Sequence, residues 1–248
     1  EKKKAQEKEI AGKVLPLKIA NVSEFSLTKN DQTITLQQNS NNEWNLSQPL
    51  KAVGDNPEAE SFLSAIEVLE KSRVVESNPN NLSQYGLETP TFKIYIKFKD
   101  DREDTLLLGD DSPMGGEIYL KLKSNPAVLL AATSKAIFNK SVYNFRDKTI
   151  FNFSSASITQ IQIKRNKHPL NLIREKEEWK VSGKVRAKAD KDAVLAFLQA
   201  IQFSRVKEFV TKKTDSLEPF GLEKPTTILT LQDENKKSYS IDLGVAEN

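Results

Sequence analysis

The pattern of apolar and polar positions near the start of the chain predicts a meander of short strands. Over residues 32–36 the two kinds of residue alternate with a period of two, which is typical of a half-buried strand. Residues 22–27 and 43–46 carry similar extended patterns, and turn residues separate the three segments. We therefore expect three neighbouring antiparallel strands.

A helical period follows the predicted meander. Asp55 occupies the expected N-cap position, and Glu58 follows three residues later, which makes a capping box. Phe62 and Ile66 then recur at the spacing of one buried helical stripe. The same arrangement returns at Asp190, so the sequence predicts two capped amphipathic helices.

A nine-residue motif shows that the chain contains an internal repeat. Residues 82–90 return as residues 217–225, with the same order of leucine, aromatic, glycine, leucine, glutamate and proline, and the same shift aligns Trp44 with Trp179. The motif predicts a short helical turn that ends at a glycine with positive φ, after which proline starts an extended run. Its residues are Tyr85, Gly86, Leu87 and Pro90 in the first copy and Phe220, Gly221, Leu222 and Pro225 in the second.

The repeat predicts an α+β fold. We expect a tandem duplication of a β-β-β-α-β-β unit, with mainly antiparallel sheets that are each covered by one helix. Residues 1–13 are expected to form a polar tether, and residues 14–153 the first unit with extra strands and a helix. Residues 154–248 form the second unit, which we expect to be truncated at its C-terminal end.

The composition limits the partners and the metal sites that the chain can have. The 248 residues are 38% hydrophobic and 29% charged, as in globular proteins, and no apolar run approaches the roughly 20 residues of a membrane span. A net charge of +3 gives no reason to expect a nucleic-acid partner. The chain has no cysteine and a single histidine, His168, which excludes thiolate metal sites and histidine pairs. We predict no cofactor and no metal.

Several short motifs together resemble a known family. They combine aromatic, glycine and proline positions, and they lie at residues 44–46, 55, 82–90, 107–109, 116–119 and 145–153. With them, nearly the whole chain resembles the bacterial domain of unknown function 4340. The resemblance implies an extracytoplasmic protein anchored to the cytoplasmic membrane by an N-terminal helix that these residues do not contain. It also implies a protein partner in the cell envelope, a transporter auxiliary subunit, and it supplies no catalytic residues.

Three function classes follow from these observations. The leading one is a non-enzymatic accessory or interaction domain of an envelope-associated complex, of the ABC-transporter or motility type. The second is a ligand-binding module for a glycan or an anionic envelope polymer, which would need a concave site lined by Tyr95, Tyr119 or Tyr143. The third is a carboxylate-based hydrolase, which would need two carboxylates about 5–10 Å apart across a cleft.

The two copies differ in charge. Residues 100–117 carry seven acidic groups against one arginine, whereas residues 158–191 carry ten basic groups against four acidic ones. The acidic run lacks the glycine and glutamate positions of a calcium loop, so it predicts a solvated hairpin tip. Strand alternation predicts that Lys164, Arg174 and Lys180 share one face, which could hold an anionic surface. The alternative is an ordinary solvated face.

Overall fold

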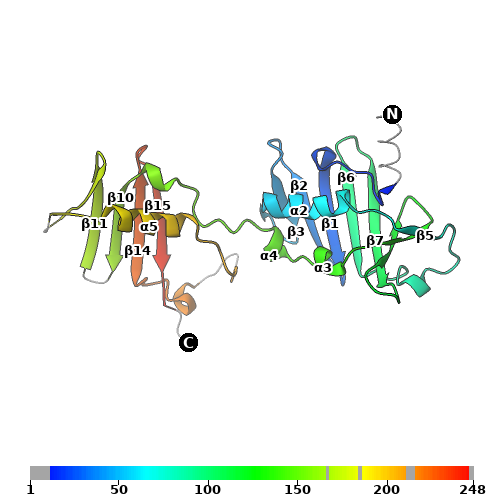
Figure 1. Cartoon of the computed structure of the whole chain (residues 1–248). Coiled ribbons are helices and arrows are strands. Elements are labelled where there is room, and N and C mark those ends of the chain that lie inside the picture. The colour runs from blue at the N-terminus through cyan, green and yellow to red at the C-terminus, as the bar shows by residue number, and fades with distance from the viewer. Residues whose placement is uncertain (1–11, 166–167, 184–185, 211–215, 246–248) are drawn as a thin grey trace, which may run out of the picture. The chain divides into compact units, whose positions relative to one another are not determined.

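The protein folds as two compact units, each built on one antiparallel sheet (Figure 1). The computed structural model describes residues 12–165, 168–183, 186–210 and 216–245. The units divide between Asp147 and Lys148, six residues before the end of the predicted first unit. Phe153 packs into the second core, which explains why this segment belongs with the second unit.

The first sheet has nine strands in the order β4-β3-β2-β1-β6-β7-β8-β9-β5, and all neighbours are antiparallel. The predicted meander forms the neighbouring strands β1, β2 and β3, which lie between β6 and β4. The strands are β1 (Val22–Lys29), β2 (Gln32–Gln38), β3 (Trp44–Gln48), β4 (Ala52–Val53), β5 (Arg73–Glu76), β6 (Phe92–Phe98), β7 (Glu103–Asp111), β8 (Ile118–Leu122) and β9 (Val128–Ala131).

Helix α2 (Asn56–Glu67) packs its apolar stripe against the first sheet (Figure 1). Asp55 caps it by accepting a hydrogen bond from the Glu58 N–H at 3.2 Å, as the sequence predicts. Phe62 stacks on Phe25 of β1, with ring centres 5.3 Å apart. Two further short helices, α3 (Lys135–Phe138) and α4 (Val142–Phe145), and the 3₁₀ turns η1 (Ile19–Asn21) and η2 (Ser83–Tyr85) complete the unit.

The second sheet has six strands in the order β13-β12-β11-β10-β14-β15, which matches β4-β3-β2-β1-β6-β7 position by position. Asp190 caps its helix, α5 (Lys191–Gln202), by accepting hydrogen bonds from two N–H groups of the first turn. The other elements are η3 (Ser155–Ser157), β10 (Ile158–Arg165), β11 (His168–Glu175), β12 (Glu178–Val181), β13 (Ala187–Lys188), η4 (Glu218–Phe220), β14 (Thr227–Asp233) and β15 (Ser238–Leu243).

The tryptophans occupy corresponding places in the two cores. Trp44 begins β3 and is buried with its ring 5.1 Å from that of Phe25. Trp179 lies on β12, the corresponding strand, and is buried in the second core. Each unit therefore holds one tryptophan as a separate reporter of its packing.

Several local features differ from the prediction. Each helix follows a short fourth strand, β4 or β13, that the sequence did not reveal. Among the described residues, strands β8, β9 and β5 extend only the first sheet. Residues 208–210, the described part of the segment that the repeat aligns with β5, form no strand. Residues 1–11 of the predicted tether lie outside the described residues, but Lys13 forms a β-bridge and a 3.2 Å ion pair with Glu70. At least this end of the predicted tether is part of the first unit.

Candidate functional site

The repeated turn lies close against the following part of the chain in each unit. Gly86 has φ 64°, in the left-handed region, as the sequence predicts. The Leu82 carbonyl accepts a hydrogen bond from the Leu87 N–H at 3.1 Å, which closes the turn. A Cβ placed on Gly109, at the end of β7, would overlap the carbonyl oxygen of Tyr85. Two glycines thus let the turn backbone lie directly against a strand.

The second copy repeats this glycine pair. Gly221 has φ 63°, and Leu217 accepts a hydrogen bond from the Leu222 N–H at 3.1 Å. A Cβ on Gly244 would overlap the carbonyl oxygen of Phe220. The motif therefore fixes the path of the chain into β14, just as it fixes the path into β6, where Pro90 and Pro225 precede the strands. We assign it an architectural role.

The tyrosines proposed for ligand binding have partners within the chain. Tyr95 donates a hydrogen bond to Glu103 at 2.6 Å, which raises the pKa of Tyr95 to about 12. The rings of Tyr85 and Tyr119 pack together, with centres 5.0 Å apart. Tyr143 belongs to α4, while Tyr95 and Tyr119 lie on β6 and β8. None of these tyrosines lines either of the two hollows described below.

The strand register separates the three basic residues predicted to share a face. Arg174 pairs across the ladder with Trp179, whose side chain is in the core. Lys180 is the next residue along β12 and points to the opposite face, as does Lys164 on β10. The predicted shared face is therefore wrong for Arg174, although Lys164 and Lys180 do lie on one side of the sheet.

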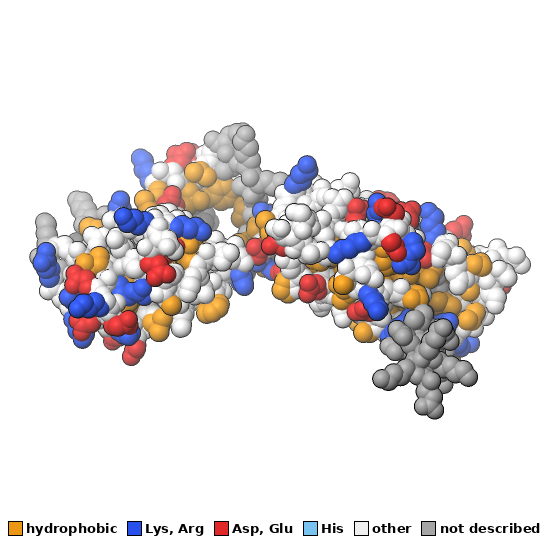
Figure 2. Space-filling model, turned by 90° about the horizontal axis from the view of Figure 1, so that it is seen from above, with side chains coloured by type: hydrophobic (Ala, Val, Ile, Leu, Met, Phe, Trp, Pro, Cys, Tyr) orange, Lys and Arg blue, Asp and Glu red, His pale blue; other side chains and the backbone are white. Residues whose placement is uncertain are grey.

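Two of the basic residues on this part of the second unit form ion pairs. Lys180 lies 2.7 Å from Glu175, whose hydrogen bond raises the pKa of Lys180. Lys188 lies 2.7 Å from Glu178, and this hydrogen bond lowers the pKa of the Glu178 carboxyl. Figure 2 shows basic and acidic side chains interspersed over the face of this unit that it displays. The local field is therefore mixed in sign.

The face of the second sheet opposite Trp179 carries a shallow hollow of about 320 Å³. Its polar lining consists of side chains with amide and hydroxyl groups, and one of these amides donates to another at 3.1 Å, from Gln162 to Asn171. These groups are uncharged donors and acceptors, which suit a ligand rich in hydroxyls. The residues are Gln160, Gln162, Asn171, Ser182, Thr230, Gln232 and Ser238.

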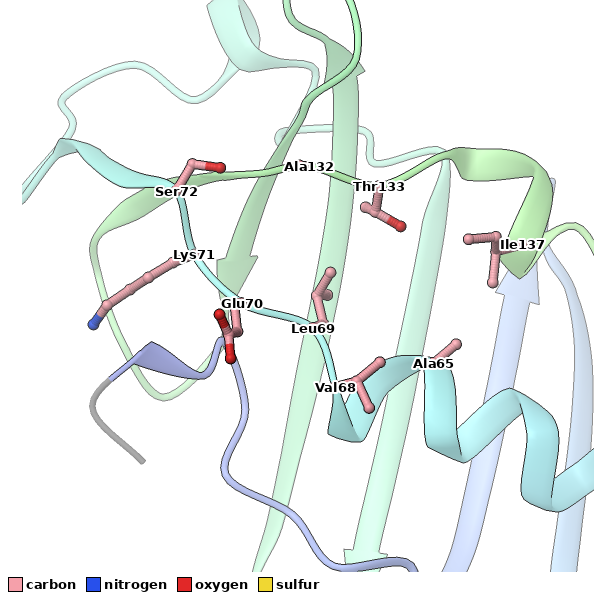
Figure 3. A pocket seen from close by; sticks show the side chains of 9 residues that line it. All are labelled: Ala65, Val68, Leu69, Glu70, Lys71, Ser72, Ala132, Thr133 and Ile137. Carbon is pink, nitrogen blue, oxygen red and sulfur yellow. The ribbon is translucent and has the colours of Figure 1, made fainter. Parts of the chain in front are cut away.

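A larger hollow of about 500 Å³ lies in the first unit, between the end of α2 and the connection from β9 to α3 (Figure 3). Figure 3 shows Val68, Leu69 and Ile137 pointing into the space between these two chain segments, with Thr133 at its upper side. Leu69 is buried, whereas Val68 is 61% and Ile137 42% exposed. The hollow thus has an apolar floor and apolar walls that face solvent.

The rim of this hollow carries little reactive chemistry. Its one carboxylate, Glu70, forms the ion pair with Lys13, and the Lys71 N–H donates to the Gly12 carbonyl at 3.0 Å. Ser72 and Thr133 add two hydroxyls. With a single carboxylate, this lining cannot perform two-carboxylate hydrolysis. The hollow is suited to binding an apolar group.

Two carboxylates outside the hollows, Asp233 and Asp100, form hydrogen bonds within turns. Asp233 is buried, and it accepts hydrogen bonds from the N–H groups of Asn235 and Lys237, each at 2.9 Å. In the acidic run, a hydrogen bond from Arg102 lowers the pKa of Asp100. Within the described part of the chain, no three His, Asp or Glu side chains gather as a metal site. No helix in these same ranges combines the length and apolarity needed to cross a bilayer.

Comparison with known proteins agrees with the repeat. The family described as Domain of unknown function (DUF4340) matches the chain twice, over residues 44–185 and 179–247. The two matches begin at Trp44 and Trp179, the tryptophans that the repeat aligns. No curated protein and no solved structure matches the chain. The chain therefore belongs to the DUF4340 family and carries the family's sequence pattern twice in tandem.

Proposed function

We propose that this chain is a non-enzymatic interaction domain that acts outside the cytoplasm, tethered to the cytoplasmic membrane. It serves as an accessory of an envelope-associated complex of the ABC-transporter or motility type, and its partner is a transporter auxiliary subunit. The observation that carries the binding role is the hollow at the end of α2, where Val68 and Ile137 face solvent above a buried Leu69. The compartment and the partner rest on the family resemblance.

The hollow favours an apolar side chain of a protein partner. Burying one aliphatic side chain stabilises a complex by about 1.5–3 kcal/mol, because apolar surface leaves water on both partners. The flanking hydroxyls of Ser72 and Thr133 and the ion pair of Glu70 supply a polar rim. An apolar centre with a polar rim is the usual anatomy of a protein interface.

Co-purification with the auxiliary subunit tests this proposal. Val68→Asp and Ile137→Asp should each reduce capture of the subunit by about tenfold or more, because a carboxylate would have to be desolvated in the interface. Val53→Asp is the matched control, since Val53 is 62% exposed but lies on the edge strand β4. Equal capture by all three variants would contradict a role for the hollow, and no capture by the wild-type chain would contradict the partner.

A second candidate function is glycan binding on the second sheet. The amide and hydroxyl groups around Gln162 and Asn171 can exchange hydrogen bonds with sugar hydroxyls. The ion pairs of Lys180 and Lys188 favour a neutral glycan over an anionic polymer. Binding to neutral envelope polysaccharide should persist in high salt and fall in Gln162→Leu. Binding that salt abolishes would instead indicate the anionic ligand.

We also propose that the two units arose by duplication of one β-β-β-α-β-β unit with a helix over each sheet. The matching strand orders, the paired glycine turns and the aligned tryptophans support this origin. An experimental structure should superpose residues 22–109 on residues 158–244. Different chain paths over these ranges would refute the proposal.

A further inference from the structure

The outer face of the second sheet, opposite Trp179, carries two rows of side chains that cross the strands. Cross-strand pairing places the members of each row side by side on β11, β10, β14 and β15. The first row is Asn171, Gln162, Thr230 and Ser240, and the second row is Ile173, Gln160, Gln232 and Ser238. Apart from Ile173, all of these side chains are amides or hydroxyls, so an uncharged hydrogen-bonding surface extends across these strands.

The second row differs in charge between the two units. Three of its members correspond to charged residues of the first unit. They are Gln160, Gln232 and Ser238, whose counterparts are Glu24, Lys97 and Glu103. The strand pairing is the same in both units, so the residues compared occupy equivalent places. The first unit thus carries alternating charges where the second unit carries only neutral groups.

The first row differs in the length of its side chains. Ser26 and Thr35 of the first unit share a hydrogen bond at 2.9 Å and are 9% and 6% exposed. Their counterparts, Gln162 and Asn171, form the equivalent hydrogen bond at 3.1 Å, but they are half-buried and line the hollow of about 320 Å³. An amide has two N–H donors and two acceptor lone pairs, so one hydrogen bond leaves further groups available to a ligand.

A second hollow, of about 440 Å³, adjoins the first one. Ile173 and Ser182 line both hollows, which makes the two continuous along the sheet. The second hollow extends the surface toward β12 and β13, where Lys180 and Lys188 form part of its lining. Two adjoining hollows on one face are suited to an elongated ligand.

The first unit shows where the chain places its additional elements. After β7, strands β8 and β9 extend the sheet sideways, while α3 and α4 lie beside α2 on the opposite face (Figure 1). Phe138 of α3 and Phe145 of α4 both pack on Phe62 there. On the outer face of this unit, Lys97 keeps 39% of its side chain exposed. These elements therefore leave the equivalent of the two rows open to solvent.

We propose that the two rows bind a neutral, linear glycan that runs across the strands from β15 toward β13. This inference rests on the glycan binding proposed above, and it specifies the charge, length and direction of the ligand. Sugar hydroxyls exchange hydrogen bonds with the amides, and Ile173 contacts the apolar C–H face of a sugar ring. Neither row holds a cation, so an acidic sugar would lose the hydration of its carboxylate without gaining a partner there.

Isothermal titration calorimetry of the full chain with neutral cello-, chito- and xylo-oligosaccharides tests the proposal. At least one series should bind, and its hexasaccharide should bind about tenfold more tightly than its disaccharide, because the longer chain reaches both hollows. Oligogalacturonate of the same length is the anionic control and should bind more weakly. Failure of all three neutral series to bind would overturn both this proposal and the glycan function. Tighter binding of oligogalacturonate, or equal binding of short and long neutral chains, would overturn this proposal alone.

The first unit supplies matched variants for the second row. Gln160→Glu combined with Gln232→Lys introduces the charges of the first unit and should weaken binding of the hexasaccharide about tenfold. Glu24→Gln combined with Lys97→Gln makes the mirror change in the first unit and should leave binding unchanged. Unchanged Trp179 fluorescence verifies that the second unit remains folded. If Gln162→Leu weakens binding while the Gln160 and Gln232 variant binds like the wild type, glycan binding stands and the role of the second row is overturned.

Discussion

Alanine substitutions at three glycines of the first unit distinguish the two ways in which an added Cβ destabilises the fold, backbone strain and steric overlap. Gly115 has φ 75° and open space around the position of a Cβ, so Gly115→Ala imposes only backbone strain. Gly109 lies outside the left-handed region, but its Cβ would overlap the carbonyl oxygen of Tyr85. Gly86 combines φ 64° with a Cβ position 2.5 and 2.7 Å from the carboxylate oxygens of Asp110.

The surroundings of the three glycines predict how much each substitution lowers the free energy of unfolding. Gly115→Ala should cost about 1 kcal/mol, because an L-residue is forced into the left-handed region. Gly86→Ala should cost about 1–2 kcal/mol, since the exposed Asp110 side chain can rotate away. Gly109→Ala should cost about 2–3 kcal/mol, because the obstacle is backbone and the whole turn must shift.

Urea denaturation measures these costs, with Trp44 fluorescence as the signal of the first unit. A Trp179→Phe background removes the signal of the second core, which contains the other tryptophan. The midpoint should fall in the order Gly115→Ala, Gly86→Ala, Gly109→Ala, with m values unchanged. If Gly109→Ala costs no more than Gly115→Ala, the close approach of the turn to β7 is refuted.

Two further predictions concern hydrogen bonds of single side chains. Asp190→Ala should destabilise the second unit by about 1 kcal/mol through loss of the helix cap, as followed by Trp179 fluorescence in urea, and an unchanged midpoint would contradict the cap. Tyr95 should ionise near pH 12 in an absorbance titration, because its pKa is raised from 10.0 by the hydrogen bond to Glu103, and Glu103→Gln should return it toward 10.0. Because the pKa of Tyr95 is higher in the folded protein, the hydrogen bond to Glu103 stabilises the fold fully below pH 10, and this contribution is lost as the pH rises toward 12. A Tyr95 pKa that is unchanged by Glu103→Gln would contradict the assignment.

Features set by neighbouring residues could be predicted from the sequence. The caps at Asp55 and Asp190 and the positive φ of Gly86 and Gly221 depend on a few adjacent positions. The pairing of β5 with β9 could not be predicted in this way. These strands are short and far apart in the sequence, and their pairing depends on the sheet that other strands have already formed.

The face occupied by Arg174 shows how a small error in register becomes a large error in a site. The turn between β11 and β12 places Arg174 opposite Trp179, one residue away from Lys180. Because side chains alternate along a strand, a shift of one residue moves a side chain to the other face. Composition revealed the excess of basic residues, but only the register shows which of them share a face.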